Sequence, residues 1–142
     1  MKLIGIGNEF RQDDAVGLYV VRQLRAKKLK DWKLVESSGE VTQLMDLWKK
    51  EKKVIVVDAL VSGAAVGTIL RFEAHRESLP AQSFRGSSHS LGLHEAIELS
   101  RAMQQLPDEL IVYGIEAKTF ENGKGLSPEV RLAAEKLIGE LT

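Results

Sequence analysis

Three polar residues, Asp14, Asp58 and His89, have the types and spacing to hold a divalent metal ion. Two carboxylates and one imidazole form an oxygen, oxygen, nitrogen donor set, which suits borderline cations. Each of the three follows a predicted strand or begins a predicted helix. Because ligands bind at the carboxyl ends of the strands in an open α/β sheet, neighbouring strands would bring all three to one edge.

The elements that must position these residues alternate between strands and helices. Val54 to Val57, four consecutive β-branched residues, predict a central strand covered on both faces and ended by Asp58. The loop 60–67 is of hairpin length, too short for a crossover helix, so the next strand returns antiparallel. Strands are expected at 3–7, 33–36, 54–57, 68–73 and 110–115, and helices at 14–28, 41–48, about 93–103 and from 128 onward, where Ser127 is the predicted N-cap. This alternation predicts an α/β three-layer sandwich: a five-stranded, mostly parallel sheet with one antiparallel strand, flanked by four helices.

Composition limits the classes of partner. The chain has 142 residues, which fit one domain over 1–142, and its 20 Lys plus Arg balance 20 Asp plus Glu. We therefore expect neither nucleic acid nor a membrane as partner. The absence of cysteine excludes disulfides, thiolate nucleophiles and cysteine-ligated metals. We identify neither a signal peptide nor a run long enough to span a membrane, which predicts a cytoplasmic protein.

Each candidate residue also has an ordinary structural interpretation. Asp13 competes with Asp14 for capping the first helix, so one can cap while the other coordinates a metal. Asp58 would be half-buried after four apolar residues and needs a partner, which favours a functional role. A lone histidine at a loop end is commonly a structural hydrogen-bonding group. His89 is a candidate metal ligand only because Asp14 and Asp58 are expected at the same edge. His75, in a charged loop, is expected to be solvated.

Two other classes of site share part of this pattern. The Gly5-Ile6-Gly7 turn is typical of dinucleotide binding, but Phe10 stands where the third glycine belongs, and two aspartates would repel a pyrophosphate. A receiver-like phosphoacceptor domain could use Asp58 as acceptor, with Asp13, Asp14 and Lys118 around it. The six-residue loop before the acid pair and the presence of His89 argue against this alternative.

Five segments, in order along the chain, together resemble the hydrogenase maturation proteases, over essentially the full length. They are Gly5-Ile6-Gly7-Asn8 with Asp13-Asp14-Ala15-Val16-Gly17, Val57-Asp58-Ala59, His89-Ser90-Leu91-Gly92-Leu93, Tyr113-Gly114-Ile115-Glu116 and Gly125-Leu126-Ser127-Pro128-Glu129-Val130. The resemblance implies a twisted five-stranded sheet and a metal-dependent endopeptidase that removes the C-terminal extension of a nickel-iron hydrogenase large subunit precursor after nickel insertion.

The resemblance also implies the roles of the site residues. Asp14, Asp58 and His89 match the metal-contacting, catalytic positions, and the metal is nickel carried by the substrate, for which zinc or cadmium can substitute in crystals. The precursor is the expected partner of a monomeric enzyme. Where relatives often carry an Asp-Gly-Gly-Thr-like turn, this chain has Ser37-Ser38-Gly39-Glu40, which removes one carboxylate from the cleft rim. Candidates for substrate contacts are Asn8, Asp13, Gly39 and Glu40.

Overall fold

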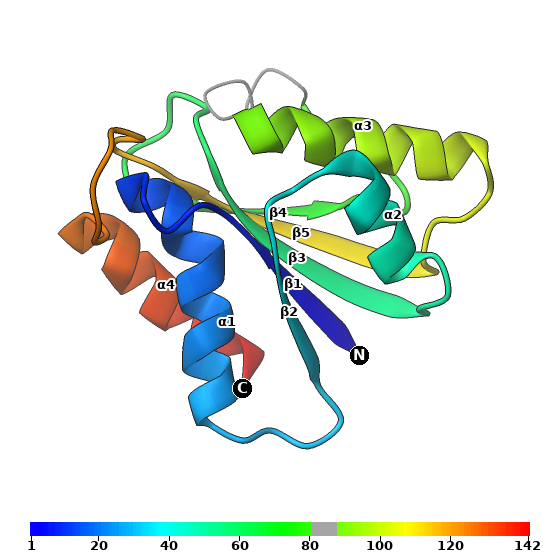
Figure 1. Ribbon diagram of the computed structural model, residues 1–142, viewed down its shortest axis with the longest axis horizontal. Coiled ribbons are helices and arrows are strands. Elements are labelled where there is room, and N and C mark those ends of the chain that lie inside the picture. The colour runs from blue at the N-terminus through cyan, green and yellow to red at the C-terminus, as the bar shows by residue number, and fades with distance from the viewer. Residues whose placement is uncertain (81–87) are drawn as a thin grey trace.

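A single five-stranded sheet organises the chain (Figure 1). The computed structural model describes residues 1–80 and 88–142, with only the backbone of 88–91. The strands are β1 (Lys2–Ile6), β2 (Lys33–Ser37), β3 (Lys53–Leu60), β4 (Ile69–Glu73) and β5 (Glu109–Glu116). The helices are the short 3₁₀ helix η1 (Gln12–Ala15), α1 (Val16–Ala26), α2 (Val41–Trp48), α3 (Ser88–Ala102) and α4 (Pro128–Leu141).

Helices cover both faces of the sheet, which confirms the predicted three-layer α/β sandwich. In Figure 1, α1 and α4 lie on one side of the strands and α2 and α3 on the other. Two apolar cores follow the alternation of side chains along the strands. On β3, Ile55 and Val57 pack with α1 and α4, whereas Val54 and Val56 pack with α2 and α3. The run of β-branched residues is thus buried on both faces, as predicted for a central strand.

The sheet order is β2-β1-β3-β5-β4, and only β4 runs antiparallel, paired with β5. The antiparallel direction of β4 is confirmed, but its hairpin-like connection to β3 is not, because β5 lies between the two strands. β3 also continues through Asp58 to Leu60, whereas the sequence analysis ended the strand at Asp58. The reason is that Asp58, Ala59 and Leu60 keep their pairing with Gly114, Ile115 and Glu116 of β5.

A close approach of α1 to the sheet depends on glycine. A Cβ atom on Gly17 would collide with the carbonyl oxygens of Ile6 and Val57, and one on Gly5 would collide with the carbonyl oxygen of Gly17. The glycines therefore allow helix–strand packing, a role independent of phosphate binding. Because Gly17 contacts Ile6 at the end of β1 and Val57 in β3, next to Asp58, it also places η1, and with it Asp14, beside these two strands.

Candidate functional site

Two fully buried carboxylates lie at the carboxyl edge of the sheet. Asp14 belongs to η1, and its main-chain oxygen accepts a hydrogen bond from the N–H of Asn8 at 3.3 Å. Asp58 belongs to β3, and its Oδ1 accepts the N–H of Ala59 at 2.8 Å. By strand alternation Asp58 lies on the face that α2 and α3 cover. Burying a carboxylate is costly without compensation, so two at one edge mark this region as a candidate site.

His89 lies in the first turn of α3, but its side chain is outside the described part of the structure. One turn further along, Gly92 packs so tightly on Gly39 that a Cβ would collide with the Gly39 carbonyl oxygen. The start of α3 is thereby fixed against the turn that follows β2. Among the side chains that are described, no three His, Cys, Asp or Glu residues gather closely enough to hold a metal ion. The set of Asp14, Asp58 and His89 therefore stays a prediction.

Asp13 connects η1 to the segment between β5 and α4. Its carboxylate accepts hydrogen bonds from the backbone N–H groups of Lys118 at 2.9 Å, Thr119 at 3.2 Å and Ser127 at 2.6 Å, and from the Ser127 hydroxyl at 2.8 Å. Neither η1 nor α1 has a side-chain capping bond, so the interpretation of Asp13 as a helix cap is wrong. Ser127 does occupy the N-cap position of α4, but its hydroxyl binds Asp13 in place of the helix.

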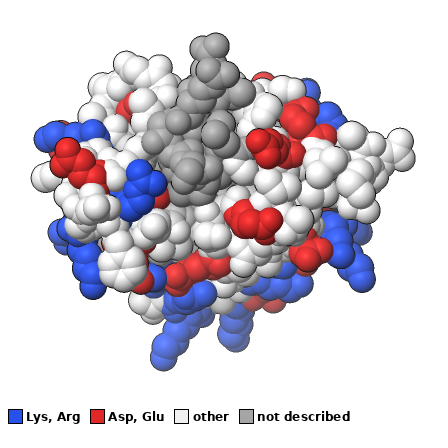
Figure 2. All heavy atoms as spheres, turned by 45° about the horizontal axis from the view of Figure 1, so that its top comes forward, with Lys and Arg blue, Asp and Glu red and all other residues white. Residues whose placement is uncertain are grey.

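Asp14 is one of the residues that line an open cleft of about 570 Å³. Residues of the β1–η1 loop, of α1, of the end of β2 and of α2 line it, including Asn8, Phe10, Arg22, Ser37 and Gln43. Figure 2 turns the upper side of Figure 1 toward the viewer and shows acidic and basic side chains interspersed over it. The cleft itself is lined by side chains of both signs, Glu9 and Glu36 with Arg11 and Arg22, so a chain segment that enters it does not meet a surface of one charge.

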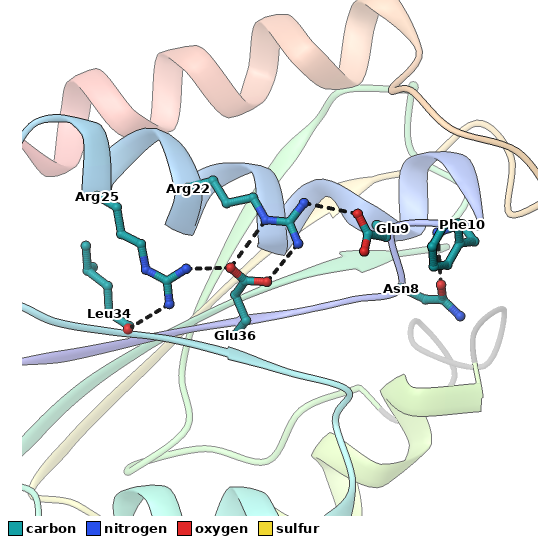
Figure 3. Close-up of polar contacts among 7 residues, drawn as sticks. All are labelled: Asn8, Glu9, Phe10, Arg22, Arg25, Leu34 and Glu36. Carbon is teal, nitrogen blue, oxygen red and sulfur yellow. Dashed lines mark hydrogen bonds and ion pairs between the residues drawn. The ribbon is translucent and has the colours of Figure 1, made fainter.

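An ion-pair network forms the wall of this cleft (Figure 3). Arg22 on α1 bonds both oxygens of Glu36 on β2, at 2.9 and 3.3 Å, and reaches Glu9 of the β1–η1 loop at 3.4 Å. Arg25 binds Glu36 from the next turn of α1. The hydrogen bond and charge of Arg22 lower the pKa of Glu36, and the hydrogen bond that Arg22 donates to Glu36 raises the pKa of Arg22. The network ties the loop that carries Asn8 and Phe10 to α1 and β2.

The remaining predicted substrate contacts have identifiable structural roles. Asn8 accepts the N–H of Phe10 on its Oδ1 and lines the cleft. Gly39 adopts φ 90° and donates its N–H to the Ser37 hydroxyl. Glu40 is the N-cap of α2, and its pKa is lowered by hydrogen bonds from the Thr42 hydroxyl and from the backbone N–H groups of Gln43 and Thr42. The capping role of Glu40 could have been found from its position directly before the helix.

Other polar residues were misjudged or missed from the sequence. His75 is half-buried, and its Nδ1 accepts the N–H of Leu110 at 3.1 Å, so the expectation that it is solvated was wrong. Glu116, at the end of β5, is 3% exposed and accepts the N–H and hydroxyl of Ser62. Glu116 pairs with Leu60 of β3. The sequence did not predict this pairing, because the expected strand ended before Leu60. For Arg22 the sequence offered only a weak signal, a charged residue directly after the apolar stretch Leu18 to Val21 of the helix.

Known proteins resemble this chain over nearly its whole length. The FrxA protein of Pyrococcus furiosus is 30% identical over 89% of this chain and 90% of its own, and the hydrogenase 2 maturation protease of Escherichia coli is 27% identical over 98% and 86%. Two solved structures are similar, the maturating endopeptidase HybD from E. coli (TM-score 0.84, 23% identity, 99% of this chain and 88% of the other) and the [NiFe] hydrogenase maturation protease HybD from Thermococcus kodakarensis (0.77, 25%, 99% and 95%).

In the described residues none of the helices has the length and apolar character to cross a membrane.

A match to a family model shows which family the chain belongs to. The family model for hydrogenase maturation protease matches residues 18–142, which is most of the chain and includes Asp58 and His89. Membership of a protease family excludes the receiver-like alternative. The chain belongs to the hydrogenase maturation protease family.

Proposed function

We propose that this protein is the endopeptidase that removes the C-terminal extension of a nickel-iron hydrogenase large subunit precursor once nickel has been inserted. The observation that carries the proposal is the pair of fully buried carboxylates, Asp14 and Asp58, at the carboxyl edge of the sheet. In a chain of a protease family that has no cysteine, these groups are the strongest candidates for the reacting centre.

The donor chemistry fits nickel as part of the substrate. Asp14 and Asp58 offer carboxylate oxygens, and His89, in the first turn of the neighbouring α3, offers an imidazole. Of these donors imidazole suits nickel best. The bound nickel of the precursor would supply Lewis acidity at the scissile carbonyl. Asp14 and Asp58 would position the precursor. Because the chain contains no cysteine nucleophile, attack by water is the simplest route of hydrolysis.

A metal that arrives with the substrate would make cleavage conditional on maturation. A precursor that lacks nickel could make the same contacts along the cleft but would lose those to Asp14, Asp58 and His89. Differential affinity for the metal-loaded form is enough to give specificity. An empty precursor would then remain uncut, with no separate sensing domain required.

Intact-mass measurement of the nickel-loaded precursor tests the function. Incubation with the wild-type enzyme should release one C-terminal peptide and shorten the large subunit by its mass. Asp58→Asn keeps the side-chain volume but removes the charge, and it should abolish release while the protein stays folded by circular dichroism. Asp46→Asn is the matched control, because the Asp46 side chain is 73% exposed on α2. Equal activity of Asp58→Asn and wild type would contradict the proposal.

A further inference from the structure

Phe10 is an aromatic side chain displayed at the cleft. It is 57% exposed, although large apolar side chains normally lose most of their surface on folding. Phe10 lines the same cleft as Asp14, which follows it by four positions in the sequence. Another strongly exposed apolar residue, Leu132 on α4, lies away from this cleft, against Pro128 and Arg131. Exposure of Phe10 therefore places apolar surface next to the candidate reacting centre.

The backbone around Phe10 is held from both sides. Its N–H donates to Oδ1 of Asn8 at 2.9 Å, and its carbonyl oxygen accepts the N–H of Gly123 at 2.8 Å. The preceding residue, Glu9, is bound by Arg22, and Figure 3 shows Glu9 and Phe10 leaving the same short loop in different directions. Two separate elements, α1 and the segment between β5 and α4, thus fix the loop on which Phe10 stands, and Asn8 braces it from within, so the exposure of Phe10 does not come from a loosely attached loop.

One further contact orients the ring. Nζ of Lys124 lies over the Phe10 ring, 5.3 Å from its centroid. A cation–π contact of this kind holds an exposed ring with a modest energy. It engages the ring without burying it, since more than half of the residue's surface stays accessible. A ligand therefore meets a ring that is already oriented, which lowers the entropy lost on binding.

We infer that Phe10 is a specificity-determining residue that binds an apolar side chain of the precursor segment next to the scissile bond. The inference rests on the proposed function and assigns this part of the cleft to that segment. Continuity of the cleft between Phe10 and Asp14 supports this occupant. The two arginines of the cleft are already engaged, because Arg22 pairs with Glu36 and Glu9 and Nε of Arg11 donates to the carbonyl oxygen of Phe120, so the Phe10 ring is the apolar contact that the cleft offers.

Steady-state cleavage of the nickel-loaded precursor by Phe10 variants tests the inference. Phe10→Ala should raise KM about tenfold, the effect of losing roughly half of a buried aromatic contact, with kcat nearly unchanged. Phe10→Leu keeps an apolar side chain and should stay within about threefold of the wild-type KM. Leu132→Ala is the matched control, because it removes an even more exposed apolar side chain outside the cleft and should leave KM unchanged.

A second measurement identifies the residue that Phe10 contacts. Precursors are made in which each apolar residue beside the scissile bond is replaced by Ala, one at a time, and each is cleaved by wild type and by Phe10→Ala. One replacement should raise KM for the wild type but have little further effect in Phe10→Ala. Such non-additivity is expected only for two groups in contact.

The outcomes separate this inference from the proposed function. If the wild-type enzyme fails to cleave the precursor, the proposed function is wrong. If the wild type cleaves but Phe10→Ala keeps the wild-type KM, the function stands and the inference is overturned. A Phe10→Ala protein that is partly unfolded at the assay temperature would also overturn the inference, because Phe10 would then be a structural residue.

Discussion

Asp13 and Ser127, 114 positions apart in the sequence, are joined by two hydrogen bonds, one from the backbone N–H of Ser127 at 2.6 Å and one from its hydroxyl at 2.8 Å. The same carboxylate also accepts the N–H groups of Lys118 and Thr119. These bonds attach the segment before α4 to η1, the element that carries Asp14. Asp13 is therefore a structural anchor directly beside a candidate catalytic residue.

Asp13→Asn should destabilise the protein by about 2–4 kcal/mol. The amide cannot accept all four bonds, and its NH₂ group would face donors that are buried with it. Urea unfolding followed by circular dichroism measures the change. Ser127→Ala removes only the hydroxyl and should cost about 1 kcal/mol, whereas Ser127→Thr keeps a hydroxyl and should cost less than Ser127→Ala. An Asp13→Asn protein as stable as wild type would show that the four bonds contribute little.

Gly17→Ala should destabilise the fold by about 3 kcal/mol, because the new Cβ would meet two carbonyl oxygens that belong to different strands and cannot both move. Gly139 provides the control. It lies in α4 with no atom within 4 Å of a Cβ, so Gly139→Ala should stabilise the protein by up to about 1 kcal/mol through helix propensity. Thermal melts of both variants check the pair. A harmless Gly17→Ala would contradict the close packing of α1 on β1 and β3.

The Arg22–Glu36 ion pair predicts a pH-dependent contribution to stability. Arg22 lowers the pKa of Glu36 in the folded protein, below the value of 4.5 that describes the free side chain. The contribution of Glu36 is therefore fully present above about pH 4.5 and is lost as the pH falls through the lowered folded-state pKa. Because the Arg22 side chain is 46% exposed, solvent screens the pair, and it should contribute at most about 1 kcal/mol.

Glu36→Gln measures this contribution. At pH 7 the variant should be less stable than wild type by at most about 1 kcal/mol in urea unfolding. The difference should shrink below pH 4.5 and approach zero once Glu36 is protonated in the folded wild type. Glu121→Gln serves as a control for the loss of one exposed carboxylate. A stability difference that stays constant from pH 7 to pH 3 would contradict the ion-pair account.

Hydrophobic periodicity was sufficient to predict the architecture. Alternation of apolar runs predicted the order of strands and helices, and Val54 to Val57 predicted the central strand. The pairing of β4 with β5 could not be predicted, because the local pattern of a strand does not specify its neighbour. For the same reason the continuation of β3 through Asp58 was missed, since it depends on the partner strand β5.

The sequence predicted which candidate residues lie at the carboxyl edge of the sheet, but not what each of them contacts. Asp14 and Asp58 were correctly placed at one edge of the sheet, because each follows a strong local signal. The role of Asp13 depends on Lys118, Thr119 and Ser127, more than a hundred residues away, and no local pattern reveals such contacts. The exposure of Phe10 likewise depends on the contacts of its loop with Gly123 and Arg22. These contacts join residues that are distant in the sequence, so no local pattern predicts them.

The central claim is that the metal recognised at Asp14, Asp58 and His89 arrives with the substrate. The most direct measurement compares nickel-loaded and nickel-free precursor as substrates for enzyme that has been treated with a chelator and then desalted, with intact mass as the readout. The account predicts cleavage of the nickel-loaded precursor at the rate of untreated enzyme, and none of the nickel-free precursor or of casein with added zinc. Cleavage of casein by zinc-loaded enzyme, lost on chelation, would contradict it.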